Sequence, residues 1–557
     1  MKIKKKGIIL EEYSGEFNFK KNLSNVNISF NRIAFIFFLF ITIFLLFSAK
    51  FIYLGQLDPI VKKITNPSNI KFRSTIVDRN GEILAKTLIT KNIGINPNDV
   101  KDIEKLLIKL KIIFPNKDFK LIKKKLYGNK FFYLEKNVNK EKLQKIIMLG
   151  EKSIQAEPRI IRIYPQKNLF SHVIGQIDDN NNGISGIENF FDYELKSNKE
   201  PLELSVDSNL QYLIRNELIL GKKIFNYIGS AAILMNINNG EILSMISLPD
   251  FDLNRREKIS EIKYINRATK ALYEMGSVFK TFTFAAGLNE NVIDVDTKFE
   301  NLEKKLKCGK NTIGEYDKEI PQDLTAEEIL IRSGNIGSVR IVQKIGIEKY
   351  KSFLNKIGII NKIDFDIEEV SQPLPITWGK CKLATSSFGH GITTTALQVS
   401  KGYAIISNGG YSINPTLIKN KYQSKKKKEL ILDRNISNKV NSVLRKIVST
   451  KDGTANFANI AGYSVGGKTG TAQKTVDGKY SKKKVNTFVS IFPSEKPKYV
   501  LLVLLDEPEA NQEYIYHYRD GSNFRYKGNW RNTAGWTTVE IAGKIIEKIG
   551  PILATKY

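Results

Sequence analysis

Cysteine, histidine and tryptophan are scarce in this sequence, with two, three and three copies among 557 residues. Two cysteines cannot build a disulfide framework. Cys308 and Cys381 could form a single bond in an oxidising compartment, and the sequence leaves that pairing open. The histidines, His172, His390 and His517, stand far from one another and from the cysteines, which argues against a zinc site. We therefore expect no metal centre.

A disordered or fibrous composition is also absent, because 42% of the residues are hydrophobic and 26% are charged. The length predicts about three or four domains and is sufficient for a sizeable core. Positive charge is what the chain has in excess: 87 Lys and Arg against 57 Asp and Glu leave a net charge of +30. The lysines are spread along the whole chain beside many Asn and Ile residues. That distribution favours a compositional bias over a polyanion-binding surface.

One long hydrophobic run stands near the N-terminus, where residues 33–49 read IAFIFFLFITIFLLFSA. A spanning helix needs about 20 residues, and Ile33–Leu54 is long enough if Lys50 reaches to the interface. A cleaved signal peptide would have a shorter run and a small-residue cleavage site, so the pattern favours an uncleaved anchor. Seven Lys and Arg residues precede the run, which predicts a cytoplasmic tail and an exported remainder. No later uncharged run approaches 18 residues, which predicts a single-pass protein.

The exported part changes character at about residue 206. Before it, Asn80-Gly81 predicts a hairpin, 101–114 predicts an amphipathic helix and 179–183 predicts a loop. After it, strands are predicted at 231–236, 241–247, 466–474, 487–492 and 499–505, and helices at 264–290, 325–345 and 536–549. Strands at both ends with helices between them indicate an α+β domain whose two ends share one sheet.

The first motif that carries chemistry is Ser277-Val278-Phe279-Lys280, at the start of a helical run. Its serine and lysine are three residues apart and so lie on one helix face. A serine hydroxyl is a weak nucleophile that needs an adjacent base. A lysine becomes such a base when apolar neighbours lower its pKa. Alone the motif is weak, because a Lys-rich chain contains several such matches by chance.

The second motif is Ser333-Gly334-Asn335. Its hydroxyl could relay a proton between a lysine and a leaving group, and its amide could hold a substrate backbone and orient the lysine. An ordinary turn has the same composition.

The third motif is Lys468-Thr469-Gly470-Thr471, inside the strand-like run 466–474. A lysine and two hydroxyls on a strand offer a site for a carboxylate, and Gly470 would let a substrate approach the backbone closely. A backbone N–H of this strand and that of Ser277 could form an oxyanion hole. An edge strand beside a Gly-rich turn is the alternative, whereas the spacing excludes a phosphate loop.

Together and in this order, the motifs resemble the set shared by serine β-lactamases and penicillin-binding proteins. Their surroundings are similar to the transpeptidase domain of class B penicillin-binding proteins, in NRATKALYEMGSVFKTFTFAAGL, SSFGHGITTTALQVSKGYAIISNGG, GGKTGTAQK and LLDEP. Two upstream segments resemble the pedestal domain of that family, RSTIVDRNGEILAKT and RIYPQKNLFSHVIGQIDDNNNGISGIENFFDYEL. The resemblance covers nearly the whole chain from residue 33.

The length, SGNIGS and the C-terminal TAGWTTVEIAGKIIEKIGPIL look most like the division-specific branch, the penicillin-binding protein 3 or septal transpeptidase. Met275, Gly334 and Ser74 depart from the usual family residues. None of these departures removes a catalytic group. Because of Ser74, the resemblance does not fix the detailed structure of the pedestal.

The resemblance implies a tail over 1–32, a membrane helix over 33–54, an elongated pedestal domain over 55–205 and a transpeptidase domain over 206–557. The last would combine an antiparallel sheet flanked by helices with an all-helical subdomain. The implied activity is a peptidoglycan D,D-transpeptidase that acts at the division septum and is a β-lactam target. It would be anchored in the bacterial inner membrane, with its catalytic domain in the periplasm. The family's chemistry needs no cofactor.

By the same resemblance, Ser277 is the nucleophile towards a stem peptide ending in D-Ala-D-Ala, Lys280 is the general base, and Ser333 relays a proton to the departing D-Ala. Asn335 completes the catalytic group. The substrate carboxylate and the oxyanion are assigned to Lys468, Thr469, Gly470 and Thr471. A stem-peptide amine would then resolve the acyl-enzyme and form a cross-link.

The implied partners are peptidoglycan stem peptides, the membrane, a membrane glycosyltransferase and other division proteins. Alternatives are an elongation-specific class B enzyme of the side wall and a non-enzymatic division scaffold. A serine β-lactamase is usually shorter and lacks a pedestal, and a β-lactam sensor would need further spans. Nucleic-acid binding is excluded by the predicted topology, because most of the charge lies outside the cytoplasm.

Overall fold

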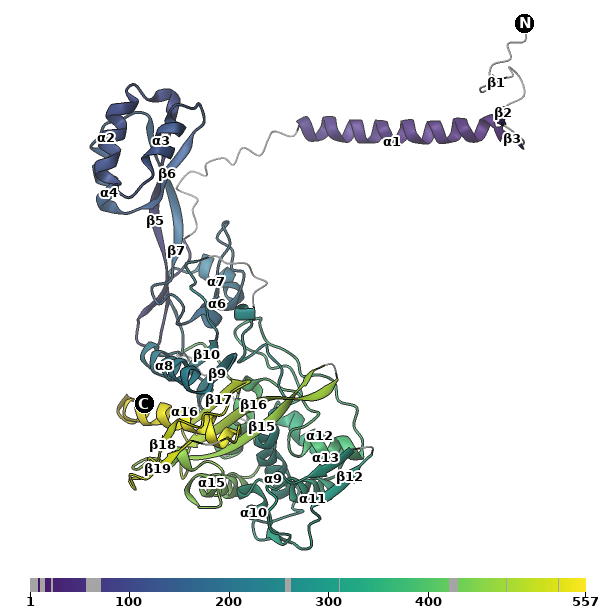
Figure 1. Ribbon diagram of the computed structural model, residues 1–557, viewed down its shortest axis with the longest axis vertical. Helices are drawn as coiled ribbons and strands as arrows, with labels where there is room; N and C mark the ends of the chain where they lie inside the picture. Colours follow the sequence, from purple (N-terminus) through teal and green to yellow (C-terminus); the bar gives the residue numbers. More distant parts are fainter. Residues whose placement is uncertain are drawn as a thin grey trace. The chain divides into compact units, whose positions relative to one another are not determined.

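The computed structural model describes residues 9–10, 16–21, 24–56, 72–255, 262–309, 311–419, 429–476, 478–528 and 530–556. These residues form two compact units, 1–71 and 72–557. Figure 1 shows the order of the elements along the chain.

The first unit contains the long apolar helix α1, Phe30–Gln56, which includes the predicted span. It follows the strands β1 (Ile9–Leu10), β2 (Glu16–Lys21) and β3 (Ser24–Ser29). Within α1, Ala34–Tyr53 has a mean hydropathy of 2.5 and none of it is buried. Among the described residues it is the one helix long and apolar enough to cross a membrane. The predicted single anchor therefore has a matching helix.

The second unit begins with a sheet in the order β6-β5-β4-β8, to which β7 adds by pairing with β5. Its strands are β4 (Ile76–Val77), β5 (Ile83–Ile95), β6 (Phe132–Val138), β7 (Ile154–Ile163) and β8 (Leu202–Glu203). The predicted Asn-Gly turn joins β4 to β5, with Gly81 at a φ of +87°. The ribbon of β5 and β7 leads to a small helical head (Figure 1), which consists of α2 (Ile103–Ile113), α3 (Phe119–Leu126) and α4 (Lys140–Ile147).

The head has a hydrophobic core of its own, separate from the main core of the unit. Helix α2 confirms the predicted amphipathic helix, because Leu106 and Leu110 face this core while Ile108 and Ile112 lie exposed. Three short helices follow β7 along the chain: α5 (Ser171–Ile174), α6 (Gly186–Phe190) and α7 (Asp192–Ser197).

A buried ion network joins the segment before β4 to strand β7 and helix α6. The Arg73 and Arg162 guanidinium groups both donate to the Glu188 carboxylate, from Nε at 2.9 and 2.7 Å. Arg73 also contacts Asp192 at 2.5 Å. Ser74 is buried beside them, and its carbonyl accepts from Arg162 at 2.8 Å. The serine found in place of the family's glycine is thus accommodated, with its hydroxyl bonded to the backbone.

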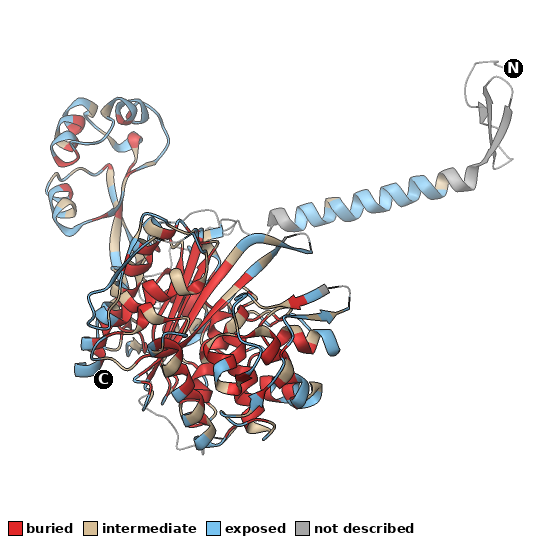
Figure 2. Cartoon of the chain, turned by 60° about the horizontal axis from the view of Figure 1, so that its bottom comes forward, coloured by how far each residue is buried: buried red, intermediate tan, exposed pale blue. Residues whose placement is uncertain are grey.

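A five-stranded antiparallel sheet forms the centre of the rest of the unit, in the order β10-β9-β17-β16-β15. Its strands are β9 (Gly229–Asn236), β10 (Ile242–Leu248), β15 (Gly466–Val476), β16 (Lys479–Phe492) and β17 (Tyr499–Asp506). The prediction that distant segments share one sheet is confirmed. Figure 2 shows these strands largely buried. Strand β15 lies at the edge of the sheet.

Two pairs of helices cover this sheet. One pair is α8 (Ser208–Phe225) with α16 (Thr538–Lys556), and the other is α14 (Ala396–Ser407) with α15 (Arg434–Ser449). The predicted closing helix over 536–549 is therefore confirmed and runs further. A hairpin of β18 (Ile515–His517) and β19 (Arg525–Lys527) precedes α16.

A helical cluster packs around α9 (Phe279–Asn289). Its other helices are α10 (Ala326–Ile331), α11 (Asn335–Ile345), α12 (Ile347–Lys356) and α13 (Lys380–Ser386). The predicted all-helical subdomain also carries two small sheets. They pair β11 (Lys298–Phe299) with β14 (Leu324–Thr325), and β12 (Lys305–Cys308) with β13 (Asn311–Gly314).

Two predicted helices need correction. The helix expected over 264–290 is present only as α9, because Tyr273 instead forms a bridge with Thr394 and Gly276 has a φ of +58°. The helix expected over 325–345 is broken into α10 and α11 at Ser333, whose φ is +62°. A left-handed residue ends a right-handed helix. Both interruptions lie in or beside a motif.

Candidate active site

Ser277 lies in the 3₁₀ turn η4, Gly276–Val278, which continues directly into α9. Its side chain is half-buried at a position where its neighbours are buried. The buried Tyr403 hydroxyl holds this turn by donating to the Val278 carbonyl at 2.9 Å. Among the described residues, the Ser277 hydroxyl makes no hydrogen bond. The serine is therefore presented by a fixed backbone rather than by a side-chain contact.

Lys280 is buried in α9, with 2% of its surface exposed. Its Nζ donates to the Ser333 carbonyl at 2.5 Å, the Ser333 hydroxyl at 3.2 Å and the Asn335 Oδ1 at 2.7 Å. The first and second motifs thus meet through this amine. Burial lowers the pKa of Lys280 to about 7, against the opposing effect of the Glu315 carboxylate. A substantial neutral fraction is available at physiological pH.

The second motif joins α10 to α11. The left-handed backbone of Ser333 turns both its carbonyl and its hydroxyl towards Lys280. Asn335 is the first residue of α11, and its Nδ2 donates to the Gly314 carbonyl at 2.7 Å. Because the amide nitrogen is engaged there, the amide oxygen is left facing Lys280.

The third motif occupies the edge strand β15, which packs against η4. Lys468 is fully buried, and its Nζ donates to the Ser333 hydroxyl at 2.9 Å. Burial and the nearby Lys280 charge lower the Lys468 pKa. Two amines therefore share one hydroxyl acceptor, an arrangement that disfavours protonation of both at once.

The two threonines of this motif are held by neighbouring segments. The Thr469 hydroxyl lies 2.7 Å from that of Thr454. The Thr471 hydroxyl accepts from the Ala534 N–H at 3.0 Å. These hydrogen bonds fix the orientation of both threonine side chains, which lie on the same short stretch of β15 as Lys468.

Glycines let η4 lie directly on β15. A Cβ at Gly470 would come within 2.2 Å of the Met275 carbonyl oxygen, and one at Gly276 within 2.7 Å of the Thr471 carbonyl oxygen. The sequence suggested that Gly470 admits a substrate. In the structure the close approach at this position is made by the chain's own backbone.

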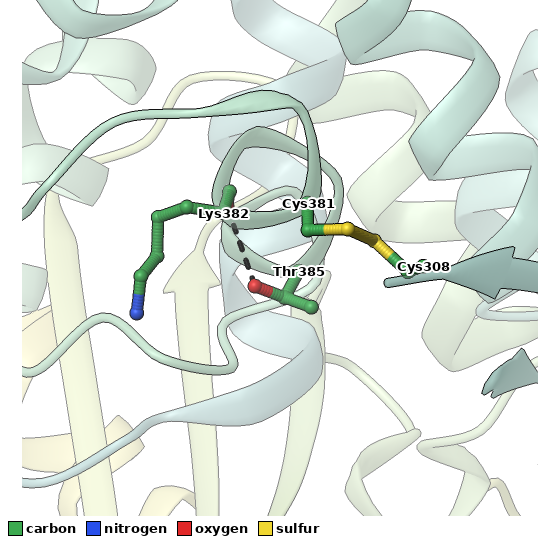
Figure 3. The surroundings of a disulfide bond; sticks show 4 residues. All are labelled: Cys308, Cys381, Lys382 and Thr385. Atoms are coloured by element: carbon green, nitrogen blue, oxygen red, sulfur yellow. Dashed lines mark hydrogen bonds between the residues drawn. A yellow bond between two sulfur atoms is a disulfide. The ribbon is translucent and has the colours of Figure 1, made fainter. Parts of the chain in front are cut away.

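The two cysteines form a disulfide, which settles the pairing that the sequence left open. Cys308 ends β12 and Cys381 lies in α13, with their Cα atoms 5.4 Å apart (Figure 3). Among the described residues, no group of three or more His, Cys, Asp or Glu side chains is arranged to hold a metal ion.

Sequence reasoning missed three residues that shape this site. Tyr403, Thr454 and Glu315 each contact a motif or its flanking turn, but none lies in a motif. Tyr403 lies inside a segment that resembles the family, but the segment does not indicate its contact with Val278, and for Thr454 the sequence offers no signal. Glu315 stands shortly before the second motif in a polar stretch, where a carboxylate looks like a solvated loop residue.

Two family models match this chain. The penicillin binding protein transpeptidase domain matches residues 230–520, and the penicillin-binding protein dimerisation domain matches residues 71–218. The first alone spans more than half of the chain.

Curated relatives match over most of their length. A probable peptidoglycan D,D-transpeptidase FtsI of Caulobacter vibrioides is 28% identical over 87% of this chain and 82% of that protein. The peptidoglycan D,D-transpeptidase FtsI of Buchnera aphidicola is 28% identical over 89% and 94%. The stage V sporulation protein D of Bacillus subtilis is 27% identical over 88% and 84%.

A solved structure shares the fold. The crystal structure of a peptidoglycan synthetase from Bifidobacterium adolescentis superposes with a TM-score of 0.65, over 87% of this chain and 96% of that one, at 18% identity.

Proposed function

The chain belongs to the penicillin-binding protein transpeptidase family, and we propose that it cross-links peptidoglycan stem peptides at the division septum. It is a peptidoglycan D,D-transpeptidase, as its FtsI-type relatives are named. The proposal that the chain acts at the septum rests on the FtsI names of these relatives. Another relative is named as a sporulation protein.

The observation that supports the mechanism best is the hydroxyl of Ser333, which accepts hydrogen bonds from both Lys280 and Lys468. It connects residues of all three sequence motifs, and the two lysines among them are buried. Neutral Lys280 takes the proton as the Ser277 Oγ attacks the penultimate carbonyl of a stem peptide. In the structure the Lys280 amine is bonded to the second motif. The hydrogen bond between a catalytic base and its nucleophile often forms fully only when substrate is bound.

Ser333 then passes its hydroxyl proton to the departing D-Ala nitrogen and takes from Lys280 the proton that came from Ser277, while Asn335 keeps the Lys280 amine in place. The close contact of η4 with β15 supports an oxyanion hole made by the N–H groups of Ser277 and Thr471. Lys468, Thr469 and Thr471 bind the terminal carboxylate of the substrate. Carboxylate binding would favour the protonated form of Lys468, which burial and the nearby Lys280 charge disfavour.

The edge position of β15 suits a peptide substrate. An extended peptide can add to an exposed strand by backbone hydrogen bonds, and this strand carries the carboxylate-binding side chains. A stem-peptide amine from a neighbouring glycan strand resolves the acyl-enzyme and forms the cross-link.

Among the described residues, α1 is the one helix that is long and apolar enough to be a membrane anchor. We propose that residues 1–32 lie in the cytoplasm, 33–54 span the bacterial inner membrane, and the pedestal (55–205) and transpeptidase (206–557) domains lie in the periplasm. The disulfide between Cys308 and Cys381 supports export, because disulfides persist in oxidising compartments. A membrane glycosyltransferase and other division proteins are the proposed partners, with the membrane helix and pedestal as docking surfaces.

Covalent labelling tests the enzymatic function. The full chain in detergent is incubated with a fluorescent penicillin, and intact mass is measured for the wild type, Ser277→Ala and Ser352→Ala. Ser352 is an exposed serine of α12 and serves as the matched control. We expect one persistent adduct on the wild type and on Ser352→Ala, and none on Ser277→Ala.

No adduct on folded wild-type protein would contradict the mechanism and favour the non-enzymatic scaffold. Rapid loss of the adduct would favour a β-lactamase. A tagged protein found along the side wall rather than at midcell would favour the elongation-specific alternative.

A further inference from the structure

Glu315 directly follows β13 and lies at the N-terminus of α11, the helix that begins with Asn335. Its two carboxylate oxygens accept hydrogen bonds from the backbone N–H groups of Asn335 and Ile336, both at 2.7 Å. The first N–H groups of a helix have no partner within the helix. The residue before this helix is Gly334, which makes no side-chain cap. Glu315 therefore supplies, from another segment, the cap that this helix lacks.

The backbone beside Glu315 fixes the amide of Asn335. The Gly314 carbonyl accepts from Asn335 Nδ2 at 2.7 Å, and Asn335 Oδ1 accepts from Lys280 at 2.7 Å. A rotated amide would place its NH₂ group against the Lys280 amine and lose both bonds. Gly314 and Glu315 thus set the position and the orientation of Asn335 together.

Charge connects Glu315 to Lys280 as well. Burial lowers the Lys280 pKa, and the Glu315 carboxylate opposes that effect. The carboxylate also compensates the positive end of α11, which would otherwise face a second positive group. The pKa of Lys280 therefore depends on a side chain that makes no contact with Ser277.

The hairpin that carries Glu315 is itself fastened. Cys308, at the end of β12, is bonded to Cys381 of α13, so the hairpin is attached to the helical cluster at a second point (Figure 3). A capping residue on a fixed hairpin can hold a helix end in one place.

We propose that Glu315 is a positioning residue for acylation: by capping α11 from outside, it holds Asn335, and through Asn335 the Lys280 amine, in their working positions. This inference rests on the proposed function, because it concerns the same acylation. It adds a residue that lies outside all three motifs.

The test compares Glu315→Gln, Glu315→Asp and the matched control Glu319→Gln, an exposed carboxylate of the same loop. Acylation of the full chain in detergent by a fluorescent penicillin is followed between pH 5.5 and 9. The amplitude reports the folded, competent fraction, and the rate constant reports the site. Partial unfolding therefore lowers the amplitude without changing the rate constant.

For Glu315→Gln we expect the plateau rate to fall about ten- to a hundredfold, as for loss of hydrogen bonds to a charged group. We also expect the acid limb of the profile to move to lower pH, because the carboxylate that raises the Lys280 pKa is gone. Glu315→Asp keeps the charge but is one methylene shorter, so its rate should fall severalfold with the acid limb in place. Glu319→Gln should match the wild type.

A Glu315→Gln rate within twofold of the control overturns the proposal. So does a slower rate with an unmoved acid limb, because a merely structural cap would give that result. If Glu315→Gln yields no folded protein, an unchanged rate in Glu315→Asp overturns it. Failure of the wild type to form any adduct would instead contradict the proposed function, and this inference would fall with it.

Discussion

Lowering the pH from 8 to 6 should slow acylation of Ser277 about tenfold. Burial lowers the pKa of Lys280 to about 7, and only the neutral amine can accept the serine proton. The neutral fraction is roughly ten in eleven at pH 8 and one in eleven at pH 6. The sign follows from the direction of the shift: the base is active above the lowered pKa and inactive below it. An ordinary lysine would remain protonated throughout this range.

The assay is the first-order rate constant for acylation at saturating fluorescent penicillin. Saturation separates this titration from that of Lys468, whose protonation affects carboxylate binding. A carboxylate probe stays ionised over the whole range, and circular dichroism at each pH serves as the control for folding. A flat rate between pH 6 and 8 on folded protein would refute the assignment of Lys280 as the base.

Two further substitutions test the surrounding structure. Gly470→Ala places a Cβ 2.2 Å from the Met275 carbonyl, so η4 must move from β15 and acylation should fall about a hundredfold. Gly379→Ala, in open space, is its control, and a wild-type rate in Gly470→Ala would contradict the packing argument. Glu188→Ala removes the carboxylate that faces the buried Arg162 and leaves Arg73 only its contact with Asp192, so it should cost about 3–5 kcal/mol in urea unfolding. A loss no greater than that of the exposed Glu200→Ala would rule out a stabilising network.

The sequence was most informative where local pattern and structure coincide. Asn80-Gly81 marks a turn in which the glycine has a positive φ. The continuous apolar run at 499–505 became the central strand β17. The order of the three motifs indicated a shared site, because each motif alone was too common to be decisive.

The sequence pattern could not predict contacts between residues that are distant along the chain. The segment before Ser277 has helical spacing, yet Tyr273 pairs with Thr394 far along the chain. The left-handed residue Ser333 is bonded to Lys280, a contact between distant residues that no local propensity describes. Glu315 acts through two backbone N–H groups, so its role became visible only when α11 was placed beside it.

The order of strands in the main sheet also bears on how the domain acquires its fold. Strand β17 pairs with β9 on one side and β16 on the other, so Leu505 lies opposite Ser230. A chain that is made from its N-terminus presents β9 and β10 long before β17 exists to pair with β9. Such long-range pairing makes folding slow and leaves apolar strand edges open meanwhile. These two strands, in which most residues are apolar, must therefore be kept from aggregation until residue 506 has been made, and catalytic competence arises only when the sheet is complete.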